Sequence, residues 1–169
     1  MVAPKFAERH YRRLCAQAAV VLLRTREEGY PAAITANKMT ATDAERGLRL
    51  AQCIVDQWRW IMDPARPPCP PWDEKTDLFG AHSFEMEAEL ARAAERQRTI
   101  AKRKPADEAA AQLADLYEAL AWLQRTRHGV AWIVMRVDVE RSAGSCPSTW
   151  CNFRCATGPH RSGGLGCNL

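Results

Sequence analysis

The sequence predicts a mainly α-helical protein in which two helical hairpins pack as a small bundle. Apolar residues recur at alternating spacings of four and three along residues 40–62, namely Ala44, Leu48, Ala51, Val55, Trp58 and Met62. Glycine and proline punctuation divides the other apolar stretches into helix-length pieces. Only residues 130–139 have clear strand propensity, and no partner strand is apparent. We therefore expect a helical bundle with at most one short strand at 130–139, where a helix also fits the spacing.

The first hairpin is expected over residues 4–62. Pro4 suits a first helical turn, and Gly29 followed by Pro31 predicts the end of the first helix. Asn37 tolerates the left-handed conformation before the second helix begins. The inward face of the first helix is expected to consist of Tyr11, Leu14, Cys15, Ala18, Val21 and Leu22.

The second helix of this hairpin has two overlapping start signals. Thr40 precedes Asp43 by three residues, and Thr42 precedes Glu45 by three, so either hydroxyl can cap the first turn. Three further apolar residues widen the inward stripe beyond a strict coiled-coil seam, namely Leu50, Ile54 and Ile61. A stripe of this width predicts a helix that another helix covers.

The chain then changes character over 63–73, which contains five prolines and cannot form regular helix. We interpret this segment as a strap across the first hairpin, with a stiff linker or a proline-rich partner ligand as alternatives.

A second helical pair is expected over 83–128. Ser83 can cap a helix that runs to about residue 103, and Pro105 separates it from the next helix, which His128 and Gly129 end. The two pieces form either a hairpin or one rod kinked at Pro105. Their inward faces are expected to be Met86, Leu90, Ala93, Gln97 and Ile100 in the first, and Leu113, Leu116, Tyr117, Leu120 and Leu123 in the second.

Residues 141–169 differ in composition from the helical domain of residues 1–140. They hold four of the seven cysteines, five of the nine glycines and no acidic residue. Such a segment cannot bury a core of its own, so we expect a flexible tail rich in Cys, Gly and Ser.

Composition and charge exclude several protein classes. The net charge of +4 is too small for a dedicated DNA-binding domain. No apolar run approaches the roughly 18 residues that a membrane span needs. The first residues lack the order of charges, apolar core and cleavage site typical of a secretory signal. We therefore expect a cytoplasmic protein without membrane contact.

One segment resembles a pattern known from small uncharacterised proteins of phages and prophages. It comprises Arg26-x-x-x-Tyr30-Pro31-x-x-Ile34, then Lys38-Met39-Thr40-x-x-x-Ala44-x-x-x-Leu48, then Ile54-Val55-x-Gln57-Trp58. The resemblance covers about residues 24–60, and Asn37 stands where that pattern usually has glycine. It implies a mobile-element context and assigns no activity or site residue.

Candidate chemistry is sparse. The spacing C-x4-C-x3-C-x4-H provides four potential zinc ligands, although a tight C-x2-C pair is missing; these are Cys146, Cys151, Cys155 and His160. His82 and Glu85 could offer two ligands at helical spacing, but nothing completes a set. Cys15 and Cys53 lie on apolar faces and are expected in the core. No catalytic or cofactor-binding residue is predicted, and no cofactor.

The sequence therefore favours a non-catalytic helical protein, an adaptor or regulator, that binds a protein partner or itself through an exposed part of the 40–62 or 105–128 stripe. One alternative is a nucleic-acid-binding accessory protein that contacts phosphates through basic residues, and another is a zinc-binding module in the tail. The phosphate candidates are Arg9, Arg12, Arg13, Arg24 and Arg26 in the first helix, and Lys102, Arg103 and Lys104 in the 96–104 basic run.

Overall fold

The computed structural model describes residues 3–65 and 67–125. These residues form two short 3₁₀ turns, η1 (Lys5–Ala7) and η2 (Arg9–Tyr11), and four helices. The helices are α1 (Arg12–Thr35), α2 (Ala41–Met62), α3 (Ser83–Arg103) and α4 (Glu108–Arg125). The expectations for the strand at 130–139, the His128–Gly129 stop, the tail at 141–169 and its zinc ligands lie outside the described residues.

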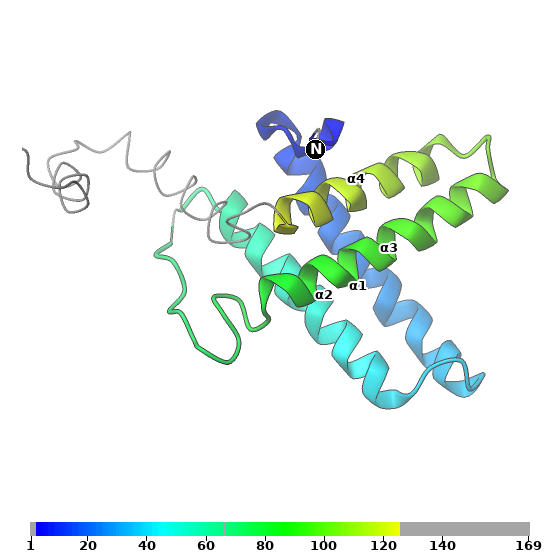
Figure 1. Cartoon of the computed structure of the whole chain (residues 1–169), viewed down its shortest axis with the longest axis horizontal. Helices are drawn as coiled ribbons and strands as arrows, with labels where there is room; N and C mark the ends of the chain where they lie inside the picture. Colours follow the sequence, from blue (N-terminus) through cyan, green and yellow to red (C-terminus); the bar gives the residue numbers. More distant parts are fainter. Residues whose placement is uncertain (1–2, 66, 126–169) are drawn as a thin grey trace, which may run out of the picture.

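The mainly α fold of two packed hairpins is confirmed. Helices α1 and α2 form the first hairpin, α3 and α4 form the second, and the second hairpin lies across the first (Figure 1). No strand occurs within 3–65 and 67–125, where an isolated bridge joins Asp73 and Asp77. The α3–α4 pair is a hairpin and not a kinked rod, because the chain turns at Lys104–Asp107 and the two helices pack together.

Helix α1 differs from expectation at both ends. It starts at Arg12 after the two 3₁₀ turns, and it continues through Gly29 and Pro31 to Thr35. Pro31 is exposed, so the helical hydrogen bond that its ring removes is lost on the solvent side, where the cost is smaller. The helix ends instead at Thr35, two residues before Asn37, which adopts a φ of 53°.

Asn37 closes α1 through a Schellman motif. Its backbone N–H donates to the carbonyl of Ile34 at 3.0 Å, and the N–H of Lys38 donates to the carbonyl of Ala33 at 2.9 Å. Thr40 then caps α2, because its Oγ1 accepts a hydrogen bond of 3.0 Å from the Asp43 N–H. Of the two predicted start signals, the one at Thr40 is used, and Thr42 lies inside the first turn.

The apolar stripe of α2 forms the centre of the core, and Trp58 is the largest of the fully buried side chains, with 2% of its surface exposed. Leu50, Ile54 and Ile61 are buried with it. Two predicted seam residues were placed wrongly: Leu48 is only half-buried and Met62 is exposed. The stripe is wider and rotated toward Leu50 and Ile54 because α2 packs against both α1 and α3.

The inward faces of α1 and α3 were also predicted with small errors. Val21 is exposed, and the buried face of α1 continues through Ala19, Arg26 and Tyr30 instead. Ile100 on α3 is exposed, because it lies in the last helical turn beyond the core.

Residue Ser83 does not cap α3, contrary to expectation. The N-cap residue is His82, whose backbone N–H donates to the Glu85 carboxylate at 3.4 Å. The Ser83 hydroxyl instead donates to the backbone and side-chain carbonyls of Gln124 on α4, both at 3.2 Å. A contact between the two ends of the second hairpin thus replaces the local one.

The proline-rich segment follows the end of α2. The indole N–H of Trp60 donates to the carbonyl of Pro68 at 3.0 Å, and Cys69 packs against the core. Trp72 remains well exposed. Among the residues that the structure describes, no helix has the length and apolar character needed to cross a membrane.

Candidate functional site

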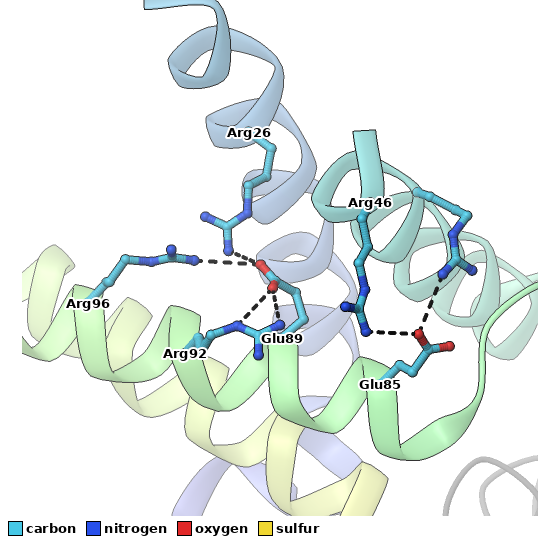
Figure 2. Close-up of polar contacts among 7 residues, drawn as sticks. Arg26, Arg46, Glu85, Glu89, Arg92 and Arg96 are labelled. Atoms are coloured by element: carbon cyan, nitrogen blue, oxygen red, sulfur yellow. Dashed lines mark hydrogen bonds and ion pairs between the residues drawn. The ribbon is translucent and has the colours of Figure 1, made fainter. Parts of the chain in front are cut away.

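A buried carboxylate surrounded by arginines lies where the two hairpins cross. Glu89 of α3 is 4% exposed, and Arg26 of α1, its ion-pair partner, is 6% exposed. Arg92 donates to the same carboxylate through Nη2 at 2.8 Å and through Nε at 3.3 Å. Arg96 approaches it at 3.5 Å. Figure 2 shows the three guanidinium groups converging on Glu89 from two helices.

This cluster contains more positive than negative charge. Glu89 provides one carboxylate for three guanidinium groups, since Arg26, Arg92 and Arg96 all contact it. The Nε of Arg26 is buried and has no hydrogen-bond partner in the described part of the chain. Burial lowers the pKa of Arg96, and the nearby charge of Arg26 lowers it further. The excess of guanidinium groups over carboxylates gives the cluster a positive charge that Glu89 balances only in part.

A concave surface of about 360 Å³ opens beside the cluster. We call it the basic pocket. It is formed by the end of α1, the α1–α2 turn, the start of α2 and the face of α3. Its charged lining residues are Lys38, Asp43, Arg46, Glu89, Arg92 and Arg96. Four of these six are basic, which gives the pocket an excess of positive charge.

The ring of Tyr30 and the backbone of Gly47 form part of the wall of the basic pocket. The Tyr30 ring also faces the Arg26 guanidinium, 5.5 Å from its centroid, in a cation–π contact. Burial raises the pKa of the Tyr30 hydroxyl. The ring is therefore neutral at physiological pH and lies between the buried Arg26 guanidinium, which does not line the pocket, and Gly47 on α2.

A second concave surface lies between α1 and α2 and is lined only by residues of these two helices. We call it the outer groove, and its volume is about 570 Å³. Its apolar lining consists of Leu23, Ile34, Ala41, Ala44 and Leu48. Glu27, Glu45, Arg49 and Gln52 provide its polar lining.

The structure separates the sequence-derived phosphate candidates. Arg9 lies in η2, and Arg12 and Arg13 begin α1. In contrast, Lys102, Arg103 and Lys104 lie at the end of α3 and just after it, at the far tip of the second hairpin (Figure 1). Arg24 forms an exposed ion pair with Glu28 at 2.7 Å. Arg26 is the buried partner of Glu89. These residues do not form one basic surface.

The sequence contained a signal for the buried cluster that was not used. Glu89 follows Met86 by three residues and precedes Ala93 by four, so it falls on the buried face of α3. Arg26 likewise follows Leu22 by four residues on the buried face of α1. Opposite charges on two facing apolar stripes predict a buried pair, although their pairing across 63 residues requires the tertiary fold.

The described residues contain no group of three or more metal-ligating side chains. Glu85, which the sequence paired with His82 as a metal candidate, forms an ion pair with Arg46 at 3.2 Å (Figure 2). It also forms an ion pair with Arg49 at 3.6 Å. Cys15 is buried as expected, and burial raises its pKa to about 12, so its thiol stays protonated. Cys53 is also buried, and burial raises its pKa.

No protein-family model, curated protein or solved structure shows significant similarity to the chain.

Proposed function

We propose that this chain is a non-catalytic helical binding protein, an adaptor or regulator, that holds an amphipathic helix of a protein partner in the outer groove. The apolar lining of that groove is the observation that carries the proposal. The groove lies between α1 and α2, the two helices of the first hairpin. A third helix can complete such a pair as a bundle by packing its apolar face into the groove.

The spacing of the groove residues fits a helical partner. Leu23 and Ile34 lie eleven residues apart on one side, and Ala41 and Leu48 lie seven apart on the other. These separations correspond to three and two helical turns, so the exposed apolar atoms extend along the groove rather than forming one spot. A partner with apolar anchors at positions i, i+3 or i+4, and i+7 would cover them.

The charges on the groove favour a basic partner helix. Glu27 and Glu45 line it, and neither forms an ion pair within the described residues. Arg49, the basic lining residue, already donates to the carbonyl of Gly80 at 2.8 Å and pairs with Glu85. Lysine or arginine residues beside the partner's apolar stripe would therefore find complementary charges.

Nucleic-acid binding is the weaker alternative, because Arg24 and Arg26 each hold a carboxylate and the remaining candidates lie on separate parts of the bundle. The zinc alternative concerns residues outside the described part of the chain. The resemblance of residues 24–60 to small phage and prophage proteins supports a mobile-element origin, and we include that origin and a cytoplasmic location in the proposal.

The test uses Leu48→Asp and Ile34→Asp in the groove, with Ile100→Asp as the matched control. Ile100 is an exposed apolar residue of α3 that does not line the groove. A partner captured by the full chain is identified, and a synthetic peptide of its amphipathic helix is titrated against each variant. We expect the groove variants to weaken binding by about tenfold or more, and the control to bind as the wild type does.

Three outcomes would overturn the proposal. The first is partner binding that the groove variants leave unchanged. The second is a dimer, seen by sedimentation, that Leu48→Asp dissociates, since the occupant would then be a second copy. The third is tight binding of a generic duplex with a log–log salt slope of roughly −5, abolished by reversing the charges of Arg12, Arg13 and Arg24.

A further inference from the structure

We propose that the basic pocket binds a phosphate group, either as free phosphate or as the terminal group of a small phosphomonoester. The proposal goes beyond the helix-binding function and uses a different surface. Lys38 from the α1–α2 turn, Arg46 from α2, and Arg92 from α3 converge on this pocket together with Arg96. Residues from three separate segments thus present cations to one concavity.

The buried carboxylate of Glu89 fixes the arginines in place. Two hydrogen bonds from Nε and Nη2 of Arg92 to Glu89 hold its guanidinium plane, and the remaining Nη1 group stays available for a ligand. Arg96 contacts Glu89 through Nη2 only, and about half of its side chain is exposed. A guanidinium held in this way loses little conformational entropy when it binds a planar or tetrahedral oxyanion.

The charge balance favours an anion of more than one unit. Four basic and two acidic side chains line the pocket, and one of the acids, Asp43, already accepts a hydrogen bond from the Thr40 hydroxyl at 2.6 Å. Arg26 does not line the pocket, but it pairs with Glu89 and adds a further buried positive charge. Arg46 also forms an ion pair with Glu85, and this carboxylate offsets about one of the positive charges. A dianion would therefore match the excess that remains.

Two further features agree with this assignment. Arg26 is more than nine-tenths buried next to the site, and its Nε has no partner in the described residues, so the cluster is not satisfied internally. The pocket also includes the first turn of α2, where the helix dipole adds positive potential. The volume of about 360 Å³ suits a small molecule.

The lining also provides a place for an organic group. Met39 and Leu50 contribute apolar surface beside the four cations, and the Tyr30 ring forms a flat wall. A phosphomonoester could place its phosphate against the arginines and its carbon skeleton against these residues. We therefore expect a phosphomonoester to bind more tightly than inorganic phosphate.

The experiment titrates inorganic phosphate, glycerol phosphate and neutral glycerol into the isotopically labelled full chain at low ionic strength and follows the backbone amide signals by NMR. We expect the two phosphates to shift signals of α3 and of the α1–α2 turn, and glycerol to shift none. Affinity for glycerol phosphate should rise between about pH 5 and pH 7.5, because the second ionisation of a phosphomonoester has a pKa near 6.

The test variant is Lys38→Gln combined with Arg46→Gln. Both side chains are largely exposed, and neither contacts Glu89, so the fold should persist. We expect phosphate affinity to fall by about tenfold or more, as for the loss of charge-assisted hydrogen bonds. The matched control is Arg24→Gln combined with Lys102→Gln, two exposed cations outside the pocket, which should bind as the wild type does.

The site would be refuted if millimolar phosphate, at about 10-fold molar excess over the protein, shifted no amide signals. Equal losses of phosphate affinity in the test and control variants would also refute it. Shifts confined to the start of α1 would place the anion elsewhere and would also refute it. Because the groove variants Leu48→Asp and Ile34→Asp do not line the basic pocket, failure of this proposal leaves the helix-binding proposal standing.

Discussion

The ring of Tyr30 on α1 lies directly against the backbone of Gly47 on α2. A Cβ atom at residue 47 would be 2.4 Å from the Tyr30 hydroxyl oxygen and 2.9 Å from its Cε2 atom. Since real side chains never approach so closely, only glycine fits at this position without movement of the ring. The contact sets how closely the two helices of the first hairpin approach one another.

Gly47→Ala is therefore expected to destabilise the protein by about 1–3 kcal/mol, as overpacking of a buried contact does. This loss should appear even though alanine is the better helix former by about 1 kcal/mol. Urea denaturation of the full chain measures the change in the free energy of unfolding.

Gly29→Ala is the matched control, because Gly29 also lies inside a helix and nothing is within 4 Å of a Cβ placed there. It should stabilise the protein by roughly 0.5–1 kcal/mol. Equal effects of the two substitutions would show that the Tyr30–Gly47 contact does not constrain the hairpin.

Glu89→Gln should be strongly destabilising. It would leave the Arg26 guanidinium buried without a counter-charge, and removing one partner of a buried ion pair costs about 3–5 kcal/mol. Glu28→Gln, which breaks the exposed pair with Arg24, should cost less than about 0.5 kcal/mol. Denaturation midpoints of the two variants make the comparison, and similar small losses would contradict a buried pair.

Trp58→Ala should cost about 3–5 kcal/mol, because its side chain is 2% exposed at the centre of the core. Leu48→Ala should cost clearly less, since Leu48 is half-buried and lines the outer groove. The sequence alone placed both residues on the same inward stripe, which implies similar losses at the two positions. Thermal unfolding of both variants compares the two losses of stability. An equal loss would show that Leu48 is a core residue.

Stability should fall at alkaline pH. Burial raises the pKa of Cys15 from 9.0 to about 12 and that of Tyr117 from 10.0 to about 12. A group whose pKa is raised in the folded state contributes stability that is complete below its unfolded pKa and is lost as pH rises toward the folded value. The free energy of unfolding should therefore decrease from about pH 9 to about pH 12.

Urea denaturation at two pH values, near neutrality and about pH 11, measures this loss. The double variant Cys15→Ala and Tyr117→Phe removes both ionisable groups and should lose less stability over the same interval. A wild-type protein and a double variant with the same pH dependence would assign the alkaline loss to other residues.

The sequence by itself determined the features that depend on neighbours within one helical turn. The Thr40 cap needs only Asp43 three residues later, and the positive φ before α2 needs only a residue such as Asn37 that tolerates the left-handed conformation. The helical spacing of apolar residues likewise sufficed to predict the helices and a core containing Trp58, whereas the choice between a second hairpin and a rod kinked at Pro105 needed the packing of α3 on α4.

The tertiary structure decided the features that depend on residues far apart in the chain. Helix α1 passes Gly29 and Pro31, since Tyr30 packs on Gly47 and Pro31 faces solvent. The Ser83 hydroxyl bonds Gln124, 41 residues away, and Arg26 pairs with Glu89, 63 residues away. Local hydrogen bonds and periodicity are encoded within a few residues, whereas burial and charge pairing are fixed only when the second hairpin crosses the first.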